Sequence, residues 1–406
     1  MKAYVALLRR RPDFRRLWAA ELVSMVGDWF SIVAVSIVSL ASPGGGVLSL
    51  ATALAAHLLP QAFAAPFGGW LADRLDKRSV LIGSSLLEGG LTVGMAIAAA
   101  RGEVFVMQVL LCARSMASSA REPATGSALP RLVERGELAA ANGLSAFTWS
   151  VAFAVGMSLG GLATALGAEV ALAIDALTFF VAVMILRHLP ALPRVSWDLD
   201  GERVPRFAPL ADILSAARAA WRPSLRRSIF AQAPIAFASG CAWLSLNLAG
   251  HVLPIAFGAA TTVGLLQAVR GVGTGVGPLL VSSRFAGGRA ADVAALAVVA
   301  SSLLLSWAPS IALVTAAAFL WGAGSGALWV IVMTEIQERA PEESRGRMIA
   351  LSGLTFTVTM SVGAIITALV LDGGASPFVA SVPAAAVALL GWALVRQPAR
   401  EAIALA

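Results

Sequence analysis

Long apolar runs dominate the pattern of residues along this chain. A helix needs ~20 mainly apolar residues to cross a bilayer, and short polar turns separate about a dozen such runs here. The pattern therefore predicts an all-α polytopic membrane protein. Its twelve predicted transmembrane helices are residues 17–40, 48–67, 80–100, 104–120, 138–166, 170–189, 228–249, 263–281, 291–307, 311–335, 348–371 and 378–395.

A polar, proline-containing stretch follows the sixth apolar run and divides the chain. We expect an N-terminal six-helix lobe at 1–189, a cytoplasmic linker at 190–226 and a C-terminal six-helix lobe at 227–406. Within the linker, apolar residues recur at helical spacing over 207–221. This spacing predicts an amphipathic helix that lies on the membrane surface.

The composition agrees with a membrane protein and excludes several other classes. Hydrophobic residues make up 58% of the 406 positions and charged residues only 13%, whereas soluble domains average about 25% charged residues. The net charge of +7 is spread among loops, so it does not predict a nucleic-acid partner. The three histidines are scattered and form no metal-binding pattern, and no nucleophile–base set indicates an enzyme.

The positive charges predict the orientation of the chain. Nearly all of the 30 Lys and Arg residues fall before the first helix or in alternate turns, and Arg101 is the one expected on the opposite side. Arg114 and Arg270 lie within apolar runs. Because cytoplasmic loops carry an excess of Lys and Arg, both termini are expected in the cytoplasm.

A charged turn is predicted between the second and third apolar runs, at 68–78, with the sequence GGWLADRLDKR. Glycines at its start would let helix ends approach closely, and Asp73 could interact with a helix N-terminus. The turn resembles the signature loop between helices 2 and 3 of the major facilitator superfamily. This chain has Asp76 where the commonest form of the loop has Gly. The variant with Asp is similar to the loop of the macrolide-efflux and siderophore-exporter branch. The stretches 122–133, 141–144, 174–179 and 340–347 resemble the same branch.

The resemblance implies a function for the whole chain. Members of this superfamily are secondary transporters with two six-helix lobes that work by alternating access. We accordingly expect a monomeric, proton-coupled exporter of amphipathic, macrolide-like small molecules in a bacterial-type inner membrane, in contact with membrane lipids. The expected driving force is the proton gradient, without a cofactor. The alternatives are a siderophore or lysophospholipid carrier of the same fold and, in another class, a membrane receptor that does not transport.

Ionisable residues within apolar runs are the candidates for proton coupling, because such groups are costly in a bilayer and usually functional. Glu21 and Asp28 are seven residues apart in the first run, and Arg114 and Arg121 have the same spacing near the fourth. Each pair therefore shares one helix face. The resemblance implies that the first and fourth helices both line a central cavity, so we predict that Asp28 carries the exchangeable proton and that Arg114 is its partner there. The alternative is a static ion pair.

The other ionisable residues in apolar runs are assigned lesser roles. Glu21 lies nearer the cytoplasmic interface, where a structural role is favoured over coupling. Glu88, Asp175 and Arg270 fall on helices that the resemblance makes peripheral, so packing or pairing within a lobe is expected.

Two further groups of residues receive roles. The resemblance implies that Asp73, the acid of the signature loop, meets the start of the eleventh helix and favours the outward-facing state. The alternative is that Asp73 has only a local role in the turn. The predicted gating residues are Gly69, Asp73, Arg74, Lys77, Arg78, Arg345 and Arg347. Polar and aromatic side chains in the seventh and tenth runs are candidates for substrate contact, although aromatic residues in a bundle more often pack. These residues are Gln232, Asn247, Trp321 and Trp329.

Overall fold

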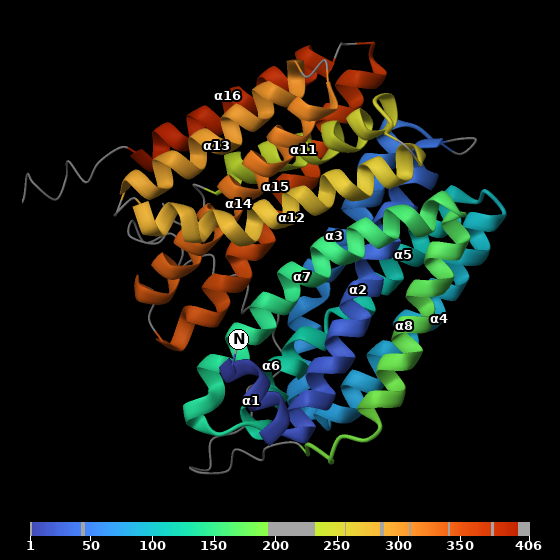
Figure 1. Cartoon of the computed structure of the whole chain (residues 1–406), viewed down its shortest axis with the longest axis vertical. Helices are drawn as coiled ribbons and strands as arrows, with labels where there is room; N and C mark the ends of the chain where they lie inside the picture. Colours follow the sequence, from blue (N-terminus) through green and yellow to red (C-terminus); the bar gives the residue numbers. More distant parts are fainter. Residues whose placement is uncertain are drawn as a thin grey trace, which may run out of the picture. The chain divides into compact units, whose positions relative to one another are not determined.

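A computed structural model describes residues 2–41, 45–193, 232–255, 257–284, 288–307, 310–339, 342–374 and 377–396. Over these residues the chain is all-helical (Figure 1). The helices of its first half are α1 (Lys2–Arg10), α2 (Pro12–Ala41), α3 (Val47–Arg74), α4 (Lys77–Ala100), α5 (Val104–Ser118), α6 (Arg121–Leu132), the 3₁₀ turn η1 (Arg135–Glu137), α7 (Leu138–Ala165) and α8 (Ala168–Leu186). Those of the second half are α11 (Ala233–Val252), α12 (Gly258–Arg284), α13 (Gly288–Trp307), α14 (Ile311–Arg339), α15 (Glu342–Asp372) and α16 (Pro377–Arg396).

Each of the twelve predicted runs corresponds to one of these helices. Within the described residues, eight helices are long and apolar enough to cross a membrane: α2, α3, α4, α7, α8, α11, α14 and α15. Twelve crossings therefore remain a prediction. The predicted surface helix at 207–221 lies outside the described residues.

Two predicted turns are largely helical, which corrects the sequence-based boundaries. The α3 helix does not end at residue 67 but continues to Arg74, and α4 begins at Lys77, so only Leu75 and Asp76 separate them. The predicted loop at 121–136 contains α6 and η1. Both segments are too polar to be recognised as spans from the sequence. Their helices are stabilised mainly by tertiary packing, which hydropathy does not report.

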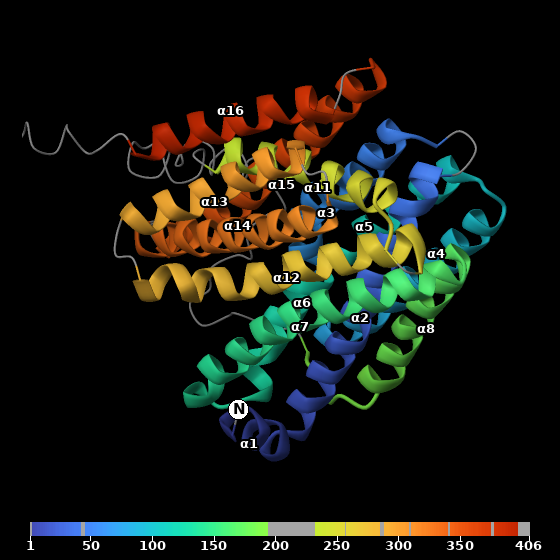
Figure 2. The same ribbon diagram turned by 45° about the horizontal axis from the view of Figure 1, so that its top comes forward.

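The chain divides into two compact units, Met1–Gly44 with Ala56–Pro209 and Gly45–Ala55 with Leu210–Ala406. In the first unit, α2 packs against α7 and α8, and α4 packs against α5 and α8 (Figure 1). In the second, α14 packs against α12 and α13, while α11 packs against α15 and α16 (Figure 2).

Large apolar side chains lie on the outside of the helices as well as in the core. Phe105 of α5, Leu177 of α8 and Leu279 of α12 are each more than half exposed. An outer surface of this kind is unfavourable in water but suits contact with lipid chains. The buried charged side chains of the described residues are Lys77, Glu88, Arg114 and Asp175. All four lie in the first unit, and the last three belong to the site described next.

Candidate functional site

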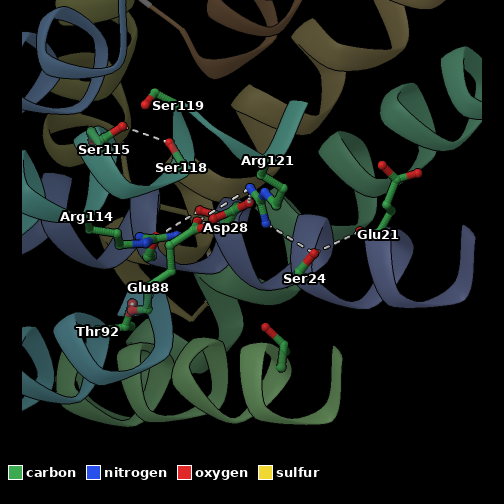
Figure 3. Close-up of polar contacts among 12 residues, drawn as sticks. Glu21, Ser24, Asp28, Glu88, Thr92, Arg114, Ser115, Ser118, Ser119 and Arg121 are labelled. Carbon is green, nitrogen blue, oxygen red and sulfur yellow. Dashed lines mark hydrogen bonds and ion pairs between the residues drawn. The ribbon is translucent and has the colours of Figure 1, made fainter. Parts of the chain in front are cut away.

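Asp28 of α2 lies between two arginines (Figure 3). Arg114, near the end of α5, donates from Nη2 to Asp28 Oδ1. Arg121, the first residue of α6, donates from Nη2 to Asp28 Oδ2 at 2.7 Å. Both carboxylate oxygens thus receive a charge-assisted hydrogen bond, the stronger class of hydrogen bond.

Each arginine also contacts a second acid. Asp175 Oδ2 of α8 lies 3.3 Å from Arg114 Nη2, and Glu88 Oε2 of α4 lies 3.6 Å from Arg121 Nη2. Both acids are 0% exposed, and neither accepts a hydrogen bond from an arginine. The Ser31 hydroxyl group also interacts with Asp175. We call Asp28, Glu88, Arg114, Arg121 and Asp175 the charge cluster.

Neutral side chains complete the surroundings of both guanidinium groups. Arg114 Nη1 donates to Ser31 Oγ at 2.7 Å, and Arg121 Nη1 donates to Ser24 Oγ at 3.2 Å. The centres of the two guanidinium groups lie 5.2 and 5.7 Å from the centroid of the Phe179 ring, within the range of a cation–π interaction. His57 of α3 interacts electrostatically with Asp28 and Arg114.

A glycine on α2 allows the acid of α8 to approach. A Cβ atom on Gly27 would lie 2.6 Å from Asp175 Oδ1 and would also overlap the side chain of Thr178. Since atoms do not approach that closely, α2 and α8 can pack at this distance only because residue 27 lacks a side chain. Gly27 therefore helps to bring Asp175 to the arginines.

The structure brings together part of the predicted site and adds to it. Asp28 and Arg114 are in contact, as both the coupling hypothesis and the alternative of a static ion pair require. The pairing of Arg121 with Asp28 was not predicted from the sequence. Glu21 lies on the other side of Ser24 (Figure 3), where it interacts electrostatically with Arg121.

Glu88 and Asp175 pair with arginines inside the first unit, one of the two roles expected for them, and this pairing places them in the same cluster as Asp28. The signal available in the sequence was their charge within an apolar run, which marks functional candidates in general. Their proximity to Asp28 depends on the packing of α4 and α8.

Comparison with known proteins identifies the family. The family model described as "Transmembrane secretion effector" matches residues 4–404, nearly the whole chain. The chain belongs to this family of major facilitator superfamily transporters. It is 27% identical to an uncharacterised MFS-type transporter of Mycobacterium tuberculosis over 402 residues, covering 91% of this chain and 88% of that protein.

Two other comparisons bear on function and fold. The chain is 27% identical to macrolide efflux protein A of Streptococcus pyogenes over 151 residues, 37% of each protein. The alignment to the uncharacterised transporter YfiS of Bacillus subtilis likewise spans only 44% of that relative. Among solved structures, a nucleoside transporter shares the fold with a TM-score of 0.73 at 12% identity, covering 98% of this chain and all of that one. The protein is thus a multi-pass membrane transporter of the major facilitator fold family.

Residues of the superfamily signature at 68–78 form hydrogen bonds with the end of α8 and with the segment that follows it. Asp76 accepts hydrogen bonds from Ser79 N at 2.9 Å and from Leu192 N at 2.7 Å. Lys77 N donates to Leu192 O at 3.1 Å, and Arg78 Nη2 donates to Arg187 O at 2.6 Å. Asp76 is the N-cap residue of α4. These contacts attach the α3–α4 connection to the segment that leaves α8.

The gating role of the signature loop stays a prediction, because several of the side chains it involves lie outside the described residues. Among its residues, Arg74 stacks over the ring of Trp70 at 5.1 Å, and the position of Gly69 is open, with no atom within 4 Å of an added Cβ. The side chains of Asp73, Arg345 and Arg347 lie outside what the structure describes.

The Asp76 contacts yield a stability prediction. Asp76→Ala removes the acceptor for both Ser79 and Leu192, so we expect the free energy of unfolding to fall by ~1–2 kcal/mol, the usual cost of a lost N-cap. Asp76→Ser keeps an oxygen that can cap α4 but has only one acceptor group, and it should recover part of the loss. Thermal unfolding of the purified protein measures both. Equal melting of wild type and Asp76→Ala would contradict the capping role.

The residues predicted to contact substrate are mostly engaged inside the second unit. Gln232 Nε2 donates to Ser352 O at 2.9 Å, and Asn247 Nδ2 donates to Trp243 O of its own helix at 2.8 Å. Trp321 is 1% exposed; its Nε1 donates to Ser239 Oγ at 3.1 Å, and its ring lies under Arg270. Trp329, in contrast, is 42% exposed. These contacts support a packing role for Gln232, Asn247 and Trp321. Trp329 is the more accessible candidate for substrate contact.

Proposed function

We propose that this protein exports amphipathic small molecules in exchange for protons. Membership of the transmembrane secretion effector family supports transport. The similarity to a macrolide efflux protein supports export of a drug-like compound, although that alignment covers 37% of each chain. The charge cluster supports coupling to protons, and it is the observation on which this part of the proposal depends.

The cluster suits proton coupling because its members come from five different helices. Asp28, Glu88, Arg114, Arg121 and Asp175 lie on α2, α4, α5, α6 and α8. Adding a proton to one carboxyl group weakens its attraction to an arginine, and each such ion pair joins two helices. The protonation state can therefore change helix packing in the first unit. In a two-state transporter, a differential interaction of this kind shifts the population between the states.

Asp28 has the position expected of the residue through which the cluster exchanges protons with the surroundings. Its side chain is 19% exposed, whereas those of Glu88 and Asp175 are almost completely buried. It also contacts both arginines. We propose that Asp28 connects the cluster to the transport pathway and that Arg114 and Arg121 change partners as the proton enters and leaves.

Proton release from energised, inside-out vesicles tests this function. The vesicles would contain the full chain and receive a macrolide, a catechol siderophore or a lysophospholipid. We expect one class to release protons from the acidified lumen, and Asp28→Asn to abolish that release at an unchanged protein level. Asp13→Asn is the matched control, because Asp13 lies on the same helix but pairs with Arg16 at the surface; it should leave release intact.

The outcomes separate the two parts of the proposal. Release that Asp28→Asn does not affect would retain proton-coupled export but reject Asp28. If no class released protons from vesicles that hold correctly folded protein, proton-coupled export of these compounds would be wrong.

A further inference from the structure

The charge cluster has more acids than bases. When all its members are ionised, three carboxylates face two guanidinium groups, which leaves one uncompensated negative charge. Buried charge without compensation is costly, and such a group normally takes up or loses a proton instead. The cluster is therefore balanced when it holds one proton.

The three acids differ in how well their charge is stabilised. Asp28 receives a hydrogen bond from an arginine on each oxygen. Glu88 and Asp175 each have one ion-pair contact, at 3.6 and 3.3 Å, and neither accepts a hydrogen bond from an arginine. Both are also fully buried. Ionisation is therefore best supported at Asp28 and least supported at the other two acids.

We propose that the cluster holds its proton on Glu88 and Asp175, shared between them, while Asp28 stays ionised. This inference rests on the proposed proton-coupled export for its functional meaning. It makes Glu88 and Asp175 the proton store and Asp28 the charged centre that orients both arginines. Coupled acids of this kind take up a proton as a group, not as single residues.

The remaining titratable groups near the cluster do not remove the imbalance. Glu21 faces Arg121 from α2 and adds a further acid. His57 faces Asp28 and Arg114 from α3, and the positive charge of Arg114 opposes a second positive charge there. Within the described residues, the two arginines are the cations in salt-bridge contact with the three acids.

Infrared spectroscopy of the full chain in lipid nanodiscs at neutral pH tests the assignment. A protonated carboxylic acid has a C=O stretching band that ionised carboxylates lack, and its position depends on the side chain that carries the proton. Exchange of Asp for Glu, or the reverse, keeps the charge of the cluster and should move the band only where the proton resides. We expect the band to move in Glu88→Asp or Asp175→Glu and to stay in place in Asp28→Glu and in the control Glu21→Asp.

Neutral variants provide a second measurement that does not depend on band position. Glu88→Gln or Asp175→Asn leaves two carboxylates facing two guanidinium groups, so the cluster no longer needs a proton. The band should then disappear in either variant. Gel filtration checks that each variant is folded.

Three results would overturn the inference. These are a wild-type protein without the band, a band that moves in Asp28→Glu or Glu21→Asp, and a band that persists in both Glu88→Gln and Asp175→Asn. The measurement uses no substrate and no gradient, so it is independent of the vesicle assay. Failure of the vesicle assay with the expected band would reject proton-coupled export and keep the proton assignment. Proton release in the vesicle assay together with an infrared result that contradicts the expectation would reject only the assignment of the proton to Glu88 and Asp175.

Discussion

Replacing Arg114 with methionine should destabilise the protein strongly and abolish transport. Methionine fills much of the same space but removes one of the two positive charges of the cluster. Asp28 and Asp175 both lose a partner, and a cluster that already needs one proton to balance its charges would need a second. Breaking a buried ion pair by removing one partner costs ~3–5 kcal/mol. The free energy of unfolding should fall by about that amount, as measured by thermal unfolding beside the vesicle assay.

Two variants make the Arg114 result specific. Arg101→Met removes an exposed positive charge in the turn between α4 and α5 and should leave stability and transport unchanged. The double variant Arg114→Met with Asp175→Asn removes an acid as well, so it should be more stable than Arg114→Met alone. If Arg114→Met melted like Arg101→Met, the cluster would not contribute to the stability of the first unit.

The second large effect is expected at Gly68, where the end of α3 meets the break between α5 and α6. A Cβ atom on Gly68 would lie 2.7 Å from Ala120 N and would overlap the carbonyl group of Ser119. These are backbone atoms that cannot move aside without shifting α6, which begins at Arg121. Overpacking costs ~1–3 kcal/mol. We expect Gly68→Ala to lower the melting temperature and, by displacing Arg121 from Asp28, to reduce proton release.

The neighbouring Gly69 provides a matched control. It lies in the same helix, and nothing is within 4 Å of a Cβ atom added there. Alanine favours a helix over glycine by up to ~1 kcal/mol, so Gly69→Ala should be neutral or slightly stabilising. Thermal unfolding of the two variants side by side measures the difference. Equal melting temperatures for Gly68→Ala and Gly69→Ala would show that the close approach at Gly68 does not determine stability.

The sequence by itself determined where the long helices lie. Hydropathy is a local property, so each apolar run indicates a helix whatever surrounds it. The same locality explains the two wrong boundaries. The segment that forms α6 is polar and contains Pro123 and Pro130, so its pattern indicates a loop. Pro123 lies in the first turn of α6, where proline is tolerated, and packing stabilises the rest.

The sequence also showed which ionisable residues lie within apolar runs, but only the tertiary structure decided which of them meet. The expected contact between Asp28 and Arg114 came from the superfamily resemblance, which implies that their helices line one cavity, and the two side chains meet in the structure. Glu88, Arg121 and Asp175 come to the same place because α6 and α8 pack against α2 and α4 packs against α6 and α8. No local pattern records that packing. The balance of charge is a property of all five side chains together, so it exists only once the helices have assembled.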